Sequence, residues 1–116
     1  MSPFTKESVD RALLNGGDLY TFDSILRAID FGEMQSHTGP NGDWVVTRIC
    51  NYPNKVALEI VLAVGTFEGL RDMEPALEEF ARDQGCDVMI AFGRVGWEEK
   101  MTPGWRKFAA QYIRSL

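Results

Sequence analysis

The chain has 116 residues, of which 45% are hydrophobic and 25% are charged, and its formal net charge is −5. This composition is that of one ordinary globular domain, large enough to bury a core without disulfides or metal, so we expect a single domain over residues 1–116. The acidic balance argues against a general nucleic-acid binder, because phosphate contacts need a local excess of Lys and Arg.

The sequence also limits the compartment. The N-terminal residues show no basic stretch followed by an apolar run, so we expect no signal peptide. The longest apolar stretch, residues 56–64, contains Glu59 and is too short to cross a bilayer. Cys50 and Cys86 each lie in an apolar segment, which favours two reduced, buried thiols. These features predict a soluble protein of a reducing compartment, without a membrane partner.

Two helices are expected at the N-terminus. Ser2 and Pro3 suit an N-cap and a first helical position, and Gly16 ends that helix. The second helix begins at Thr21 and ends at Gly32. Its apolar residues recur at i, i+3, i+4 and i+7: Phe22, Ile25, Leu26 and Ile29.

The middle of the chain predicts an antiparallel meander of three strands. These strands cover residues 33–38, 44–50 and 56–64, where β-branched and apolar residues predominate. Residues 38–42 and 51–54, rich in Gly, Pro and Asn, form the two turns. The third strand is the most continuously apolar and should lie centrally in the sheet.

A long helix and a further strand follow the meander. Thr66 caps the helix, Gly85 ends it, and Pro75 should kink it or restart it. The residues expected to pack on the sheet are Leu70, Met73, Leu77 and Phe80. A strand at residues 86–92 then implies parallel pairing with residues 56–64 through a right-handed crossover.

The C-terminal part is ambiguous. Residues 93–97 break the strand and open a short helical turn that extends through Met101. Beyond it, the apolar residues match both helical spacing and strand alternation: Trp105, Phe108, Ala109, Ala110, Tyr112, Ile113 and Leu116.

Charge is distributed unevenly along the chain. Residues 68–83 hold six acids and two arginines, whereas residues 94–114 hold five basic residues and two acids. The basic C-terminal part is either a solvated mixed surface or a surface for an acidic partner.

The element order resembles the GNAT fold of N-acetyltransferases, and residues 18–116 resemble the small GNAT-like proteins of tailed bacteriophages and prophages. The matching segments are Trp44-Val45-Val46-Thr47, Tyr52-Pro53, Leu58-Glu59-Ile60, Ala81-Arg82-Asp83-Gln84-Gly85-Cys86 and, most specifically, Gly93-Arg94-Val95-Gly96-Trp97. The resemblance implies an α/β domain (a mixed α+β sheet) whose last segment is a strand.

The cofactor loop departs from the family pattern. In catalytic GNAT members, backbone amides of a glycine-rich loop at a helix N-terminus hold the pyrophosphate of coenzyme A. Here Gly65, Thr66 and Gly69 occupy that loop, with no basic residue and with Glu68 among them. They are either an atypical acetyl-coenzyme A site or only a strand end and a helix start.

The residues for acid–base chemistry are also incomplete. The resemblance places a general base at Glu59, which could instead face solvent or pair with Arg48. The tyrosine expected as general acid is absent from the helix that carries Trp97. His37 lies beside a turn and is expected to be an exposed loop residue. No cluster of Cys, His and Asp has metal spacing, so no metal is expected.

Arg94 and Trp97 are the candidate interaction residues. A guanidinium and an indole on one turn can form a recognition patch, or they can close the sheet and cap its carbonyl groups. Trp44 and Trp105 are expected at the edge of the core.

The resemblance and its gaps together lead to a functional hypothesis. The chain is expected to be a catalytically silent GNAT-like scaffold, without cofactor, that acts as a phage virion or virion-assembly component. Its partners would be other phage structural proteins or itself, in the virion or the host cytoplasm. The alternative is an active coenzyme A-dependent N-acyltransferase that uses Glu59 and an atypical loop, and a regulator that binds a host protein stays open.

Overall fold

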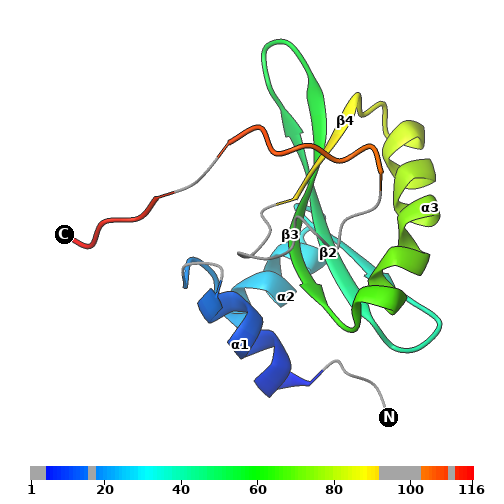
Figure 1. Cartoon of the computed structure of the whole chain (residues 1–116). Coiled ribbons are helices and arrows are strands. Elements are labelled where there is room, and N and C mark those ends of the chain that lie inside the picture. The colour runs from blue at the N-terminus through cyan, green and yellow to red at the C-terminus, as the bar shows by residue number, and fades with distance from the viewer. Residues whose placement is uncertain (1–4, 16–17, 92–102, 110–111) are drawn as a thin grey trace.

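The computed structural model describes residues 5–15, 18–91, 103–109 and 112–116 (Figure 1). In these residues the elements are α1 (Lys6–Asn15), α2 (Phe22–Asp30), β1 (Gln35–Thr38), β2 (Trp44–Asn51), β3 (Val56–Val64), α3 (Phe67–Asp83) and β4 (Val88–Ala91). The expected helical turn at 97–101, Arg94 and Trp97 lie outside the described residues.

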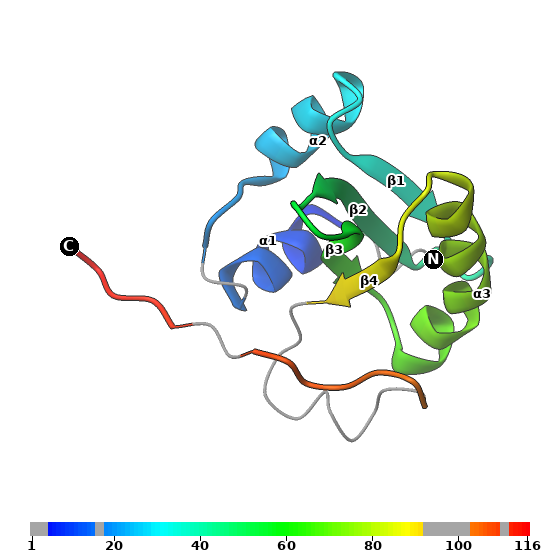
Figure 2. The same cartoon turned by 90° about the horizontal axis from the view of Figure 1, so that it is seen from above.

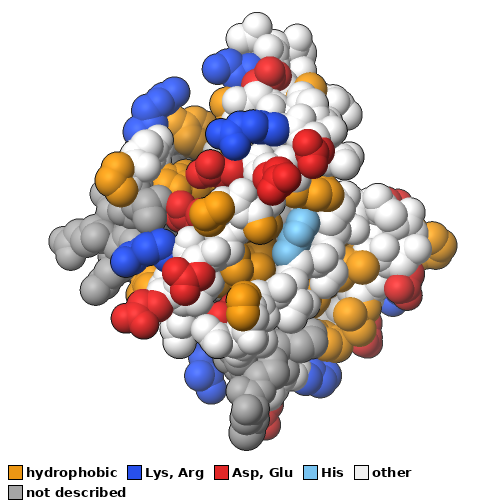
Figure 3. Space-filling model, turned by 90° about the vertical axis from the view of Figure 1, so that its right-hand side faces the viewer, with side chains coloured by type: hydrophobic (Ala, Val, Ile, Leu, Met, Phe, Trp, Pro, Cys, Tyr) orange, Lys and Arg blue, Asp and Glu red, His pale blue; other side chains and the backbone are white. Residues whose placement is uncertain are grey.

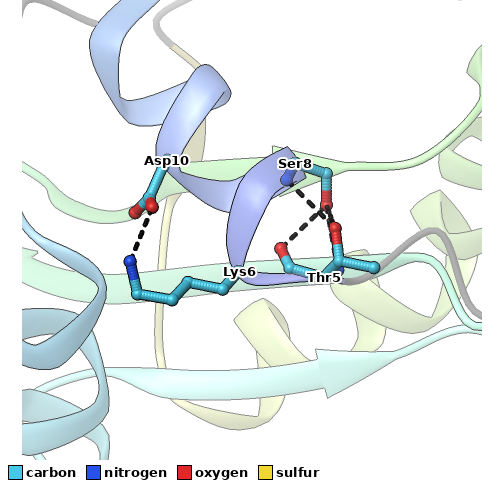
Figure 4. A network of polar contacts seen from close by, with 4 residues as sticks. All are labelled: Thr5, Lys6, Ser8 and Asp10. Atoms are coloured by element: carbon cyan, nitrogen blue, oxygen red, sulfur yellow. Dashed lines mark hydrogen bonds and ion pairs between the residues drawn. The ribbon is translucent and has the colours of Figure 1, made fainter.

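The first helix begins later than the sequence suggested. Thr5, not Ser2, caps α1: the Ser8 amide donates to Thr5 Oγ1 at 3.1 Å, and the Thr5 amide donates to Ser8 Oγ at 2.9 Å (Figure 4). Lys6 and Asp10 add an ion pair at 2.8 Å one turn apart. This reciprocal capping fixes the start of α1 at Lys6.

The second helix is confirmed at both ends. Thr21 Oγ1 accepts from the Ser24 amide at 3.1 Å, and Ser24 Oγ accepts from the Thr21 amide at 2.9 Å. Gly32 follows the helix with a φ of +77°, the left-handed conformation in which glycine lacks a steric penalty.

The sheet has the strand order β1-β2-β3-β4. The β1–β2 and β2–β3 pairs are antiparallel, and β4 runs parallel to β3. The predicted meander and the parallel pair are therefore confirmed. The last strand begins at Val88, so Cys86 precedes it rather than lying within it.

A β-bulge interrupts β3. Val46 lies opposite Leu62 while Thr47 lies opposite Ile60, so Val61 is an extra residue in the ladder. Val61 and Leu62 consequently both pack toward α1 and α2, whereas Ile60 packs toward α3. The described β3–β4 pairs extend from Ala57 with Val88 to Ile60 with Ala91, the last described residue of β4.

Helices cover both faces of the sheet (Figure 2). On one face α1 and α2 bury a helix-pair cluster: Val9, Leu13, Ile25, Met34, Trp44, Val46, Leu62 and Val64. On the other face α3 buries an α3-side cluster: Val45, Met73 and Leu77, with Ile60, Ala63, Leu70 and Met89 partly buried against it. The packing predicted for Leu70, Met73 and Leu77 is confirmed, and α3 continues through Pro75 as one helix.

The described C-terminal residues do not contain the strand that was expected there. Residues 103–109 and 112–116 adopt neither helix nor strand. A strand needs a neighbouring strand for its backbone hydrogen bonds, and β4 pairs only with β3 among the described residues. No helix in the described residues is long and apolar enough to cross a membrane.

Candidate functional site

The N-terminus of α3 is built around a buried carboxylate. Asp43, at the end of the β1–β2 turn, is 2% exposed, and its Oδ1 accepts from the Thr66 amide at 3.2 Å. Its Oδ2 has no hydrogen-bond partner among the described residues. The carboxylate thus places negative charge at the positive end of the α3 dipole.

The two glycines of the loop make room for this carboxylate. A Cβ at Gly65 would lie 2.7 Å from Asp43 Cγ, and one at Gly69 would lie 2.6 Å from the same atom. Gly65 also has a φ of +152°, which side chains rarely adopt. The packing of Asp43 therefore explains why both positions are glycine, without any role in binding a ligand.

Two amides at the start of α3 have hydrogen-bond partners within the chain. The Gly69 amide donates to Thr66 Oγ1 at 3.0 Å, and the Thr66 amide is directed to Asp43. Glu68 is exposed in the same turn and adds a second negative charge. Each carboxylate within about 5 Å of a bound pyrophosphate would repel it by about 1 kcal/mol or more.

An apolar cavity of about 80 Å³ adjoins this loop. Its lining comes from β2, β3, α3, the end of β4 and the C-terminal segment, and includes Ile60, Phe67, Leu70, Ala91 and Trp105. Ile60 and Ala91, which form the last described pair of β3 and β4, both line it. Ligand pockets of drug-sized molecules measure about 300–1,000 Å³, so the described cavity fits a small apolar group at most.

Glu59 lies in an ion pair rather than facing solvent. The carboxylate is 5% exposed, and its Oε1 lies 2.8 Å from Arg48 Nη2 across the β2–β3 ladder. Arg48 Nη1 donates to the Tyr20 hydroxyl at 3.1 Å. Burial alone would lower the pKa of Arg48, but the hydrogen bond and charge of Glu59 raise it above its ordinary value.

Cys50 completes this network. Its thiol donates to Glu59 Oε2 at 3.2 Å, so both carboxylate oxygens have partners. Burial, and then the hydrogen bond to the Glu59 carboxylate, raise the pKa of the Cys50 thiol. Cys50 and Cys86 are unpaired, as predicted, but each is half-buried rather than fully buried.

His37 is not the exposed loop residue that the sequence suggested. It lies in β1, half-buried beside hydrophobic side chains (Figure 3), and its ring meets Phe80 edge-on with centroids 4.9 Å apart. The Thr47 hydroxyl donates to Gln35 Oε1 at 3.0 Å and so accepts from His37 Nε2 at 2.8 Å. Burial lowers the pKa of His37.

The structure separates the candidate residues. Gly65, Thr66 and Gly69 lie together at the start of α3, around Asp43. Glu59 faces the α1–α2 side of the sheet with Tyr20, away from the α3-side cluster. Across the described ranges, no group of three or more His, Cys, Asp or Glu residues could hold a metal ion.

Sequence reasoning missed Asp43. The only signal was an acidic residue placed between a Gly-containing turn and an apolar strand, a position where aspartate is common for local reasons. Its partner Thr66 is distant in sequence, so only the folded chain shows that they meet.

A helix pair on one face, an antiparallel meander, a covering helix and a parallel strand define an acetyltransferase-like fold. No family model matches the chain, and no curated protein matches it.

Solved structures share this fold. A probable acetyltransferase superposes with a TM-score of 0.62 at 11% identity, covering 96% of this chain and 87% of that chain. The Thermus thermophilus protein TTHA1254 superposes with a TM-score of 0.54 at 18% identity, covering 98% and 97%, and a point mutant of it gives 0.56. At these identities the likeness shows the fold alone.

Proposed function

We propose that this chain is a GNAT-like domain that does not transfer acyl groups and that acts as a scaffold through contacts with other proteins. The observation that carries the proposal is the Asp43 carboxylate at the N-terminus of α3. Asp43 places its own negative charge where a catalytic relative would receive the cofactor pyrophosphate.

The state of Glu59 supports the same proposal. A general base must reach the proton that it abstracts. Glu59 is buried, with Oε1 on Arg48 and Oε2 on the Cys50 thiol, so neither oxygen is available to an incoming amine in this arrangement.

The test of lost catalysis is a titration of the full chain with acetyl-coenzyme A, followed by thermal unfolding. A ligand at about 100 times its Kd stabilises a fold by about 2.7 kcal/mol, a rise of several degrees in Tm. We expect no rise in Tm and no acylation of amine substrates. A saturable rise would contradict the proposal.

A charge-removal variant tests whether the two carboxylates are the reason that the loop does not bind pyrophosphate. Asp43→Asn combined with Glu68→Gln removes both negative charges from the loop, and Asp72→Asn on the same helix is the matched control. If these two carboxylates exclude anions, inorganic pyrophosphate should raise the Tm of the double variant and leave the control and the parent chain unchanged.

A second candidate, an acyltransferase with an atypical cofactor loop, is favoured by one observation. The apolar cavity adjoins the loop through Phe67 and Leu70, which is where an acyl group would need shelter if a cofactor bound there. This candidate predicts that acetyl-coenzyme A raises Tm and that Glu59→Gln lowers the rate of acylation.

We further propose that the protein partners are virion or virion-assembly components of a tailed phage. This step rests on the resemblance carried most specifically by Gly93-Arg94-Val95-Gly96-Trp97. Mass spectrometry of purified particles is the test: the chain should be enriched in particles, and its confinement to the host lysate would contradict a virion role.

A further inference from the structure

The turn between β1 and β2 carries a pair of residues that can react with each other. Asn41 is exposed, and Gly42 follows it with a φ of +81°. Asparagine is a thermolabile residue, and a glycine after it presents a backbone nitrogen that no side chain shields. The pair therefore brings a nucleophilic nitrogen next to a side-chain amide at the surface of the molecule.

Both ends of this turn are fixed against α3. The Gly39 amide donates to the Asp43 carbonyl oxygen at 2.8 Å, and the buried Asp43 carboxylate accepts from the Thr66 amide. A Cβ at Gly39 would lie 3.0 Å from Met73 Sδ, so the turn also packs closely on the helix. A change in the main-chain length of the turn must therefore displace one of its ends.

We propose that Asn41 is a site of spontaneous modification, and that its conversion to isoaspartate detaches Asp43 from the start of α3. In the first step the Gly42 nitrogen attacks Asn41 Cγ. A C–N bond forms, the bond from Cγ to the side-chain nitrogen breaks, and that nitrogen leaves as ammonia with the proton that Gly42 has lost. The product is a cyclic imide.

Water completes the conversion without any oxidation or reduction. It adds to one of the two carbonyl groups of the imide and breaks the bond from that carbon to the Gly42 nitrogen. Addition at the main-chain carbonyl of residue 41 leaves isoaspartate, in which the chain runs through Cβ and Cγ and is longer by one carbon atom. The lengthened turn no longer fits between Gly39 and Asp43, which are both held against α3.

A hydrogen bond in the turn controls the rate. The Gly42 amide donates to the Gly39 carbonyl oxygen at 3.0 Å, so the turn must open before the nitrogen can lose its proton. We expect slower conversion in the folded chain than in the chain unfolded in guanidinium. In the folded chain, Asn41 should still react faster than Asn51 and Asn54, because a residue with a side chain follows each of those.

The first test is peptide mapping by mass spectrometry after the full chain has been incubated at mildly alkaline pH. Conversion adds about 1 Da and one negative charge to the peptide that contains Asn41. Labelling with an isoaspartyl methyltransferase distinguishes isoaspartate from aspartate. We expect isoaspartate at Asn41 in an incubation that leaves Asn51 and Asn54 unchanged. Its absence from the folded chain, while the unfolded chain converts, would overturn the proposal.

The second test measures the effect on α3. In the aged chain the Thr66 amide should exchange its hydrogen faster, and Tm should fall by several degrees, because the buried carboxylate has lost its donor. Asn41→Gln should keep its Tm during the same incubation, since the longer glutamine side chain forms an imide far more slowly. Isoaspartate at Asn41 with unchanged exchange at Thr66 would contradict the release of Asp43.

Asn15→Gln is the matched control. Asn15 also precedes a glycine in the sequence, but it is the last residue of α1 and not part of the turn. This variant should lose Tm on ageing as the parent chain does. If it keeps its Tm, the loss belongs to Asn15 and the proposal is wrong. None of these readouts involves acetyl-coenzyme A, so they decide this inference separately from the proposed function.

Discussion

Asp43 and Thr66 connect the turn before β2 to the start of α3, through a carboxylate oxygen that accepts a backbone amide hydrogen at 3.2 Å. Gly65 and Gly69 leave space for that carboxylate. The aspartate and the two glycines therefore form one structural unit, and a change in any of them should depend on the others.

A double-mutant cycle on Asp43 and Gly69 tests this dependence. Gly69→Ala alone should destabilise the fold by about 1–3 kcal/mol, because the new methyl group collides with the carboxylate. In an Asp43→Ala background the collision is removed, and alanine is preferred over glycine in a helix by about 1 kcal/mol. Gly69→Ala should then be neutral or stabilising in urea unfolding. If the two substitutions change the unfolding free energy additively, Asp43 and Gly69 do not depend on each other.

Glu59 should matter for stability. Glu59→Ala leaves the partly exposed Arg48 without its partner and should cost about 1–3 kcal/mol, less than a fully buried pair because water reaches the guanidinium. Arg48→Met combined with Glu59→Leu should cost less than Glu59→Ala alone. Urea unfolding of the parent chain and the two variants measures these losses. A loss below about 0.5 kcal/mol for Glu59→Ala would show that the ion pair does not stabilise the fold.

Leu77 is the sharpest test of the α3-side cluster. It is 3% exposed between α3 and the sheet, so Leu77→Ala should cost about 2–5 kcal/mol by leaving a cavity. Glu79→Ala, two residues along the same helix and exposed, should change stability by less than about 0.5 kcal/mol. If both substitutions lower the unfolding free energy equally, α3 packs on the sheet through a different face.

His37 predicts a pH dependence. Because burial lowers its pKa in the folded state, the unfolded chain takes up the proton first as pH falls below about 6.5. The stability from neutral His37 is complete above that pH and is lost as pH falls toward the folded pKa. His37→Gln should flatten the fall in unfolding free energy from pH 7 to pH 5. If the variant shows the same change of unfolding free energy with pH, carboxylates rather than His37 cause it.

The two cysteines should be free but slow to react. Thiol titration in denaturant should return both thiols. In the folded protein, alkylation near pH 7 should be slower than in denaturant, because burial raises the pKa of Cys50 and of Cys86 and less thiolate is present. Loss of both thiols without reductant would contradict the unpaired state.

Local patterns were enough to predict much of the fold. The i, i+3, i+4 stripe of α2, its Thr21 cap and the turn residues between strands each depend on neighbours in sequence. The start of α1 was wrong because two positions compete as caps, and the hydroxyl pair of Thr5 and Ser8 decides between them.

The site was harder to predict because its contacts join distant residues. Nothing near Asp43 shows that Thr66 will meet it, and His37 becomes half-buried only when α3 brings Phe80 against it. The Arg48–Glu59 pair was foreseeable as one of two alternatives, since a hairpin register brings those positions together. The C-terminal segment has strand-like residues, but its partner strand is not provided by the described chain.

The extra residue Val61 has a consequence for how β3 tolerates the deletion of one residue. The additional amino acid in β3 directly follows Ile60, which pairs with Ala91 in the last described pair with β4, and Ile60, Ala91 and Trp105 all line the apolar cavity. Deletion of Val61 would restore the regular alternation of side chains between the two faces of β3. Glu59 and Val64 would each stay on the face that they occupy now. A one-residue deletion at Val61 therefore separates chain length from side-chain chemistry at this position, because the pairs of β2 with Ile60 and with Leu62 keep their partners.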